Sequence, residues 1–586
     1  MANKQTTNHW HLFIRLLKIA DFQRSAILFA AFLTVVQSLL TALQPNLYQY
    51  IIDHVIMARH FNQLELWALI LLIWLIAQTI IAFYNSYLSE KIAQSIILKL
   101  RQYIYDHLTH LKLSFFDKTP VGTAVTRSIT DVQTITDLFS SGIITILGDL
   151  VQIVAILFCM FLINWKLTLL TLTVIPLLIW AGNYFRKGTR DTFQEVRNQV
   201  AALNAFLQER ITGMGVIQLF NQQKSEYSKF KNINRKHRDA NFKSIFYYSV
   251  FFPMVEVLVA LSFAIIISYG SIQIFEKNLQ LGEVTAFIMF INLFFRPVRA
   301  IADRFNNIQM GIVAAERIFN LLDATENQEH YGEIIPQKLN GKIEFKSVWF
   351  RYNQSENHWI LKDVSFLLEP GKSLAIIGST GSGKTSIANL ITYNYQHEKG
   401  QILIDDQEVQ NYHLPSLRKR IAFVLQDVFL FSGSIESNLS LKQENLHQQK
   451  FQSIAEDIGA WDFIKNLPGA LDFNVMERGL SLSQGQRQLI SFLRALAVDP
   501  DIIILDEATS SIDSQSESLI QKAIELLLKN RTAVVIAHRL STIKHCNQIM
   551  VVESGNIVEK GTPTELLLKD GHYKQLYETQ ISHKED

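Results

Sequence analysis

Long apolar runs dominate the first half of the 586-residue chain, and the second half lacks them. A helix needs about 20 largely apolar residues to cross the hydrocarbon core of a bilayer. Six stretches approach that length, so the pattern predicts six membrane-spanning helices. They are Ala26–Ile52, Leu64–Tyr87, Gly142–Trp165, Leu167–Tyr184, Phe246–Ile274 and Val284–Ile301.

The segments between these spans alternate between short and long. Residues 53–63, 164–166 and 275–283 are short, and the turn at 164–166 predicts a hairpin of the third and fourth spans. Residues 88–141 and 185–245 are long, follow a helical period and are rich in Lys and Arg. Because cytoplasmic segments attract positive charge, we expect both long segments and both termini on the cytoplasmic side.

Each long segment contains one break in its helical pattern. The breaks lie at 115–135, "FFDKTPVGTAVTRSITDVQTI", and at 215–230, "GVIQLFNQQKSEYSKF", far from the predicted spans. Such a break is either a plain helix–helix turn or an element that docks on the second half of the chain. Periodicity does not decide between the two.

Charged residues also occur inside the apolar runs. Glu256 in the fifth span and Arg296 in the sixth fall at similar predicted depth, and Asp149 in the third is a weaker case. Ionisable groups inside a bilayer are costly and mark functional sites. Either Glu256 and Arg296 pair or line a wet cavity, or each one snorkels or makes a structural hydrogen bond.

The pattern changes after a polar linker at 321–340. The stretch "KIEFKSVWFRY" alternates like a β-strand, and further short apolar runs follow it. We therefore expect a multidomain protein, with an all-α six-helix polytopic transmembrane domain fused to an α/β domain. The expected boundaries are 1–320 for the transmembrane domain and 341–580 for the α/β domain.

The run "SLAIIGSTGSGKTSIANLI" reads as strand, glycine loop and helix, which is the context that a phosphate-binding loop (P-loop) needs. Glycines let backbone N–H groups turn toward phosphate oxygens at a helix N-terminus. Lys384 would reach the β- and γ-phosphates, and Thr385 would offer its hydroxyl to Mg²⁺. The loop consists of Gly378, Ser379, Thr380, Gly381, Ser382, Gly383, Lys384 and Thr385.

The stretch "DIIILDEATSSID" at 501–513 is an aliphatic strand that ends in two acids. Asp506 suits Mg²⁺, directly or through water, and Glu507 suits polarising an attacking water. Two other predicted strands end at His538 and at Gln426. His538 would contact the γ-phosphate and Gln426 would ligate Mg²⁺ or hold the lytic water, since nucleotides bind at the carboxyl edge of such sheets.

Charge and cysteine content narrow the function further. The formal net charge of +2 gives no reason to expect a nucleic-acid partner. Cys159 lies in an apolar run and Cys546 in the second half, so we expect neither a structural disulfide nor a metal site from them.

The polar stretch "GLSLSQGQRQLI" at 479–490 completes an ordered set of motifs. In this order they resemble the nucleotide-binding domain of the ATP-binding cassette (ABC) superfamily. The whole chain resembles a half-size ABC exporter of the type IV fold, similar to bacterial multidrug transporters of the MdlA/MdlB type. The resemblance covers nearly the whole chain and implies ATP and Mg²⁺ as cofactors.

The resemblance also implies a role for each matching residue. Tyr352 would stack on adenine, and Gln426 would be the Q-loop residue. Glu507 would be the catalytic carboxylate and His538 the switch histidine. Asp513 would take the D-loop position.

The signature motif implies that a second chain takes part in binding ATP. Ser483, Gly485 and Gln486 match the family's signature, which meets the ATP held by a partner chain. Gln484 departs from the commonest form, LSGGQ, and the sequence offers no reason for it. The two loop stretches "FFDKTPVG" and "VIQLFNQQ" and the "ERG" at 477–479 match regions where loops meet cassettes in this family.

The resemblance implies a bacterial ATPase that lies among the lipids of the cytoplasmic membrane. It would export hydrophobic or amphipathic small molecules across that membrane. Two such chains form the working unit, as a homodimer or with a paralogue. A lipid or lipid A-type flippase and an ATP-driven importer of a chelated metal (siderophore type) remain alternatives. A non-transport ATP-operated switch is disfavoured because six spans are fused to the cassette.

Overall fold

The computed structural model describes Leu12, Ile14, Arg15 and Lys18, and residues 24–138, 144–324, 331–353, 358–441, 447–506, 514–537, 540–575 and 577–578. The chain divides into two compact units. The helical unit comprises Met1–Thr109 and Val121–Ala324, and the α/β unit comprises His110–Pro120 and Thr325–Asp586. A short piece of the first long loop therefore belongs with the α/β unit.

Among the residues that the structure describes, six helices are long and apolar enough to cross a membrane. This confirms the six predicted spans. They cover Arg24–Ile56, Phe61–Thr109, Thr145–Ile163, Trp165–Thr212, Gln223–Phe275 and Leu281–Val298.

Three helices, α3, α9 and α11, run from the apolar spans into the long polar segments without a break. Helix α3 has 46 residues, which at the α-helical rise is a length of about 69 Å, more than twice the thickness of a bilayer core. The helical elements of this unit are α2 (Arg24–Tyr50), η2 (Ile51–Ile56), η3 (Phe61–Gln63), α3 (Leu64–Thr109), α5 (Val121–Thr126), η4 (Arg127–Asp131), α6 (Val132–Asp137), α7 (Ile144–Ile163), α8 (Trp165–Leu172), α9 (Ile175–Thr212), α10 (Met214–Leu219), α11 (Gln223–Phe275) and α12 (Leu281–Leu322).

The fourth predicted span is divided into α8 and α9. Asn164 begins α8, where its side-chain oxygen accepts hydrogen bonds from the backbone N–H groups of Lys166 and Leu167. This cap closes the predicted hairpin of α7 and α8, which pack together. The break after Leu172 was not predicted, and Pro176 explains it, because proline fits the first turn of a new helix and not a helix interior.

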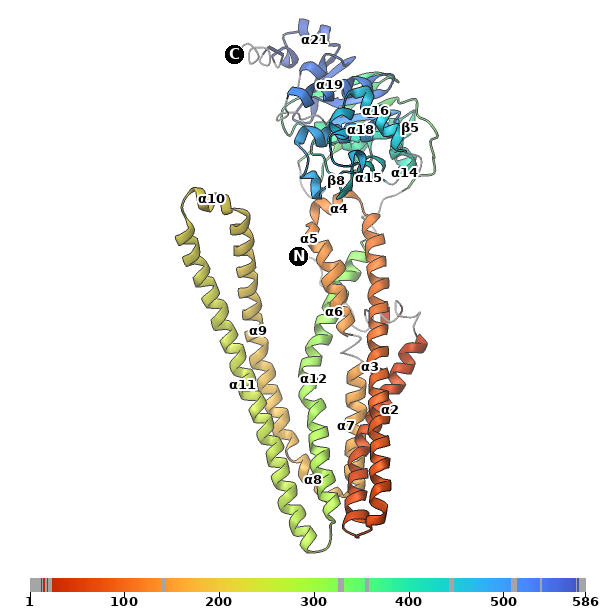
Figure 1. Ribbon diagram of the computed structural model, residues 1–586. Coiled ribbons are helices and arrows are strands. Elements are labelled where there is room, and N and C mark those ends of the chain that lie inside the picture. The colour runs from red at the N-terminus through yellow and green to blue at the C-terminus, as the bar shows by residue number, and fades with distance from the viewer. Residues whose placement is uncertain are drawn as a thin grey trace. The chain divides into compact units, whose positions relative to one another are not determined.

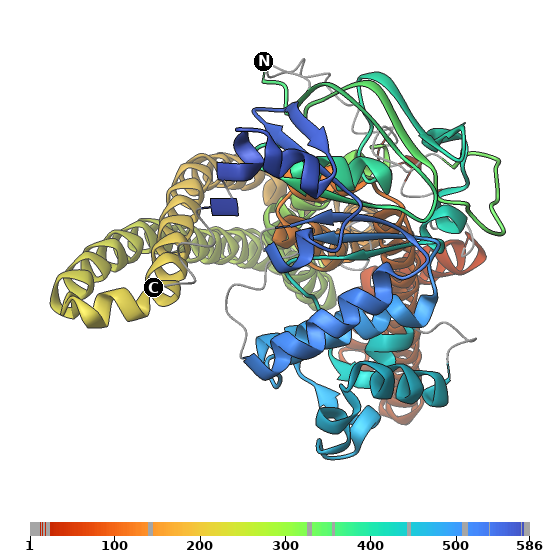
Figure 2. The ribbon, with the colours of Figure 1, turned by 90° about the horizontal axis from the view of Figure 1, so that it is seen from above.

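Helices α9 and α11 lie side by side along their length, with α10 at the tip (Figures 1 and 2). Helix α2 packs on α3, α7 and α12. Large buried side chains of α12, among them Phe287, Phe290 and Ile291, share one apolar core with side chains of α2, α7, α9 and α11. The helical unit is therefore built around α12.

A π-helical turn, η2, ends the first span beside the start of α12. Asp53 Oδ1 accepts a hydrogen bond from the backbone N–H of Gly282 at 2.7 Å. A side chain at position 282 would place its Cβ 2.5 Å from Asp53 Oδ2, so it would displace the Asp53 carboxylate from this contact. π-helical turns occur mainly where function requires an irregular helix.

The α/β unit contains a central sheet in the order β12-β11-β3-β10-β9-β6 and a smaller antiparallel sheet in the order β2-β1-β4-β5. In the central sheet β3, β6, β9, β10 and β11 run parallel, and β12 is antiparallel to β11. The strands are β1 (Ile343–Phe350), β2 (Leu361–Leu368), β3 (Ser373–Ile377), β4 (Lys399–Ile404), β5 (Gln407–Glu408), β6 (Ile421–Val424), β7 (Gly433–Ser434), β8 (Asn474–Val475), β9 (Ile502–Asp506), β10 (Thr532–Ile536), β11 (Gln548–Glu553) and β12 (Asn556–Gly561).

The described part of the α/β unit also contains helices. They are α4 (Leu113–Lys118), α13 (Lys384–Ile391), η7 (Val409–Asn411), α14 (Leu414–Arg418), α15 (Ile435–Ser440), α16 (Gln448–Ile458), α17 (Trp461–Lys465), η8 (Ala470–Asp472), η9 (Glu477–Gly479), α18 (Gln484–Val498), α19 (Ser514–Leu528), α20 (Leu540–Ile543) and α21 (Pro563–Leu568).

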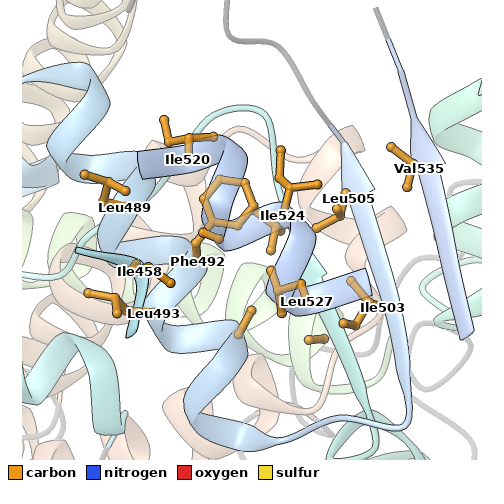
Figure 3. Packing of buried hydrophobic residues seen from close by; sticks show 14 of the residues in the cluster. Ile458, Leu489, Phe492, Leu493, Ile503, Leu505, Ile520, Ile524, Leu527 and Val535 are labelled. Carbon is orange, nitrogen blue, oxygen red and sulfur yellow. The ribbon is translucent and has the colours of Figure 1, made fainter. Parts of the chain in front are cut away.

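The central sheet separates two apolar cores. Ala375 and Ile377 of β3 belong to one core, while Leu374 and Ile376 belong to the other. Because β3 is buried on both faces, it reads as a continuous apolar run rather than an alternating one. Figure 3 shows the first core, where Phe492 of α18 packs toward α19.

Candidate active site

The parallel strands end at one edge of the central sheet. Strand register aligns Val424 with Leu505, Asp506 with Ile536, and Ile536 with Ile376. The loops that follow β6, β9, β10 and β3 therefore start at the same level. This edge is the expected place for a nucleotide, outside the carboxyl ends of the strands.

The P-loop has the backbone conformation that its glycines allow. Gly378, Gly381 and Gly383 have φ values of +150°, +82° and +106°. A Cβ at position 378 would lie 2.0 Å from the carbonyl oxygen of Val552, and one at 383 would lie 2.6 Å from Leu361 Cδ2. Gly383 also caps α13, so the loop leads its N–H groups directly to a helix N-terminus, a favourable place for phosphate.

Lys384 is buried within the loop. Its Nζ donates hydrogen bonds to the carbonyl oxygens of Gly378 at 2.9 Å and Ser379 at 2.8 Å. Burial lowers the pKa of the Lys384 ammonium, and the nearby Asp506 carboxylate opposes that shift. The P-loop thus holds the Lys384 amine where it can reach phosphates bound in the loop.

Thr385 and Asp506 meet across the site. The hydroxyl of Thr385 donates to Asp506 Oδ2 at 3.2 Å, and Asp506 is 9% exposed at the end of β9. A hydroxyl and a carboxylate oxygen are the ligand types that Mg²⁺ takes together with phosphate oxygens. The two residues therefore fit the magnesium ion that accompanies ATP.

Tyr352 follows β1 and is exposed. Its hydroxyl shares a hydrogen bond with Ser386 Oγ at 2.9 Å, in the first turn of α13. The ring therefore lies beside the P-loop helix, where a stacked adenine would be expected. Ser386 was missed from the sequence because no motif requires a hydroxyl there.

The signature residues form the start of α18. Ser483 Oγ accepts a hydrogen bond from the Gln486 N–H at 3.2 Å, and Gln486 Oε1 accepts one from the Ser483 N–H at 3.0 Å. This reciprocal pair is a capping box. Arg487 holds the preceding turn, because its guanidinium donates to the carbonyl oxygen of Leu482 at 2.9 Å.

The glutamine at position 484, where the commonest signature motif has glycine, is compatible with the local backbone. Gln484 is the first residue of α18, is exposed and does not have a positive φ. The backbone therefore does not require glycine at this position. Gly485, the glycine that the chain keeps, is buried.

Four other predicted residues differ in how far the structure describes them. Gln426 is exposed, two residues beyond the end of β6 and not at the strand end itself. Glu507, Asp513 and His538 lie outside the described residues. Their roles stay predictions, although Glu507 directly follows Asp506 in the chain.

The first loop docks on the α/β unit through α4. The hydroxyl of Tyr395 donates to Asp117 Oδ2, and Lys112 Nζ donates to Gln396 Oε1 at 3.4 Å. This supports the docking interpretation for the start of the break at 115–135, up to Pro120, while residues from Val121 onward belong to the helical unit. The break at 215–230 contains α10, which lies in the helical unit, so its docking stays a prediction.

A polar cavity of about 360 Å³ lies among α2, α3 and α7, inside the apolar spans. Its lining is joined by hydrogen bonds from Asn85 Nδ2 to Gln37 Oε1 at 2.8 Å and from Thr34 to Asn85 Oδ1 at 3.0 Å. Asp149 lines the same cavity. Glu256 and Arg296 are both exposed in this chain, and their pairing stays a prediction.

Comparisons with known proteins agree with this geometry. Residues 27–298 match the ABC transporter transmembrane region, and residues 361–510 match the ABC transporter family. A probable multidrug resistance ABC transporter ATP-binding/permease protein, YheH of Bacillus subtilis, is 36% identical over 537 residues, 89% of this chain and 79% of that protein.

This chain belongs to the half-size ABC exporters. An ATP-dependent lipid A-core flippase of Legionella pneumophila (strain Paris) is 35% identical to the exporter over 512 residues, 87% of each chain. A solved bacterial Atm1-family ABC exporter with ATP bound shares the fold, with a TM-score of 0.79 at 22% identity over 95% of this chain and 98% of that one.

Membership settles the general activity. The exporter is an ATP-binding ATPase coupled to transport, and it is a multi-pass membrane protein of the bacterial type. A half-size exporter carries one transmembrane domain and one cassette, so it works with a second half-transporter. The α/β unit is called the cassette from here on.

Proposed function

We propose that this half-transporter exports hydrophobic or amphipathic compounds across the cytoplasmic membrane, with both termini and the cassette on the cytoplasmic side. The polar cavity among α2, α3 and α7 carries this proposal. Eleven of its 13 lining residues have polar side chains, although they lie in apolar spans. Polar groups inside a membrane mark substrate pathways, and a polar cavity beside apolar helix faces suits a molecule with both characters.

Two ATP molecules would be held between two cassettes. Tyr352 and the P-loop of one chain would bind one ATP, and Ser483, Gly485 and Gln486 of the partner would close over its phosphates. The start of α18 supports this role because helix N-termini attract phosphate. Mg²⁺ held by Thr385 and Asp506 would supply positive charge for the β- and γ-phosphates.

Hydrolysis would reset the closed pair. Glu507 would accept the proton of the attacking water, His538 would contact the γ-phosphate, and Gln426 would orient the water or Mg²⁺. Asp513 would lie in the D-loop beside the partner's site. ATP would drive closure because it binds the closed state better than the open one.

Exposed apolar side chains support contact with a second half-transporter. At the tip of α9 and α11, Leu219 is 82% exposed and Phe220 69%. On the cassette, Phe431 and Leu480 are also exposed, and Leu480 directly follows the "ERG" turn of η9. Apolar groups gathered on a surface mark interfaces. We assign the α10 tip of one chain to this cassette surface of its partner.

The test is transport by the purified protein in proteoliposomes. With MgATP on the cassette side, the exporter should accumulate the amphipathic dye Hoechst 33342, and Glu507→Gln should abolish this while retaining ATP binding. A general base typically contributes about 10²–10⁴-fold to the rate. Retained ATPase activity in Glu507→Gln would refute its assignment as the base.

Lipid flipping is the second candidate, favoured by the similarity to the lipid A-core flippase. A fluorescent phospholipid in the same liposomes, with dithionite to bleach the outer leaflet, distinguishes the two. ATP-dependent lipid movement without dye accumulation would replace the proposal. ATPase activity that appears only after co-expression with a paralogue would identify a heterodimer.

A further inference from the structure

Tyr395 lies between the proposed adenine ring contact and the first docking helix. It follows α13, in the segment before β4. Its ring meets the ring of Tyr352 at 90° with 4.9 Å between centroids. Its hydroxyl donates to the carboxylate of Asp117 in α4. All three residues belong to the cassette, so one side chain connects Tyr352 with α4.

The ring contacts form a packed cluster. Phe350 is 1% exposed and meets Tyr352 with 4.8 Å between centroids and Tyr395 with 6.0 Å. Aromatic pairs at these separations attract one another beyond the area that they bury. Tyr352 is exposed on its outer side, and the buried Phe350 and the half-buried Tyr395 contact it on the inner side, so a base that presses on Tyr352 pushes it toward these two rings. A movement of Tyr352 is therefore passed to Tyr395.

The contact with α4 is equally directional. Burial, and then the hydrogen bond to Asp117, raise the pKa of the Tyr395 phenol, which favours the protonated hydroxyl that donates. A hydrogen bond to an ionised carboxylate is stronger than one between neutral groups. Lys112, which precedes α4, contacts Gln396, the next residue after Tyr395. Residues 395 and 396 thus hold α4 near both of its ends.

We infer that Tyr395 is a positioning residue through which α4 senses the adenine base of ATP and not its phosphates. This inference rests on the proposed function, because it needs Tyr352 to stack on adenine. Phosphates contact the backbone N–H groups of the P-loop, whereas the adenine base stacks directly on the ring of Tyr352. Phosphates can reach Tyr352 only through the hydrogen bond between its hydroxyl and Ser386. The base contacts the ring itself, so it has the more direct route to Tyr395 and Asp117.

The experiment is hydrogen exchange of the full-length exporter, read at residues 113–118. Mg-AMP-PNP carries the base, and Mg-tripolyphosphate lacks it. Both are used at concentrations that protect the P-loop amides at 378–385 to the same extent. Mg-AMP-PNP should change the exchange rate of α4 by about threefold or more, and tripolyphosphate by less than about twofold, because local opening reports local contacts.

Tyr395→Phe keeps the ring and removes the hydroxyl. It should leave the Kd of AMP-PNP within about twofold, raise basal exchange of α4 by about tenfold because a hydrogen bond to a charged group is lost, and abolish the response to nucleotide. Asp117→Asn should give a smaller rise. Tyr412→Phe is the matched control, since Tyr412 is buried and its hydroxyl donates to the Ile404 carbonyl oxygen at 2.8 Å. It should keep the wild-type response.

Each outcome decides one question. An equal response of α4 to tripolyphosphate, or a preserved response in Tyr395→Phe, overturns the inference about Tyr395. Tyr352→Leu tests the adenine contact separately, because it should weaken AMP-PNP binding and leave tripolyphosphate binding unchanged. If AMP-PNP binds Tyr352→Leu as tightly as wild type, the proposed role of Tyr352 fails, whatever α4 does.

Discussion

Ser483 has two separable roles, one in capping α18 and one in the proposed contact with the partner's ATP. Its hydroxyl accepts the Gln486 N–H at 3.2 Å, and Ser483→Ala removes that acceptor. Loss of an N-cap typically costs about 1 kcal/mol of helix stability. Hydrogen exchange at the Gln486 amide in the full-length exporter should therefore become about fivefold faster.

Ser483→Asp is the matched variant. Aspartate caps helices about as well as serine, so exchange at Gln486 should stay within about twofold of wild type. Its negative charge would face the partner's phosphates, so ATPase activity should be lost in both variants. If Ser483→Ala leaves exchange at Gln486 unchanged, the capping box does not hold the first turn. If Ser483→Asp keeps full ATPase activity, the signature is not at the phosphates.

Three further predictions concern the cassette. Gly383→Ala should lower ATP affinity at least about tenfold, because the left-handed backbone and the close contact with β2 oppose a side chain. Gly381→Ala is the control, since Gly381 has φ +82° but open space around it. It should lose clearly less ATP affinity in the same binding assay. Phe492→Ala should destabilise the protein by about 3–5 kcal/mol, seen as a lower unfolding temperature, while Leu480→Ala at an exposed position should change it little. Burial lowers the pKa of His397, so its neutral form stabilises the fold above about pH 6.5 and this contribution is lost as pH falls toward the lowered value; His397→Gln should reduce the drop in unfolding temperature between pH 7 and pH 5, and an unchanged drop would contradict this.

Local patterns in the sequence were enough for the spans and the P-loop. Hydropathy locates spans because each is one apolar segment, and the strand–loop–helix run ending at Thr385 is a continuous motif with its own backbone requirements. The same locality explains why Gln484 was puzzling. Its position as the first residue of α18 follows from the capping box, which is visible only in three dimensions.

Contacts between distant segments of the chain could not be predicted from local sequence patterns. Asp117 and Tyr395 are 278 residues apart and neither belongs to a periodic pattern. The resemblance pointed to the loop region but not to the phenol that receives it. The break before Pro176 was missed for a different reason, because apolar composition continues across it and hides the change of helix.

The unbroken length of α3 has a mechanical consequence. If α3, about 69 Å long, moves as a rigid rod, a displacement of one end tilts the whole helix. A displacement of about 3 Å at the end that leads to α4 corresponds to a tilt of only about 2–3° over the whole helix. A movement of α4 would therefore reach the apolar, membrane-spanning part of α3 as a slight change of helix tilt.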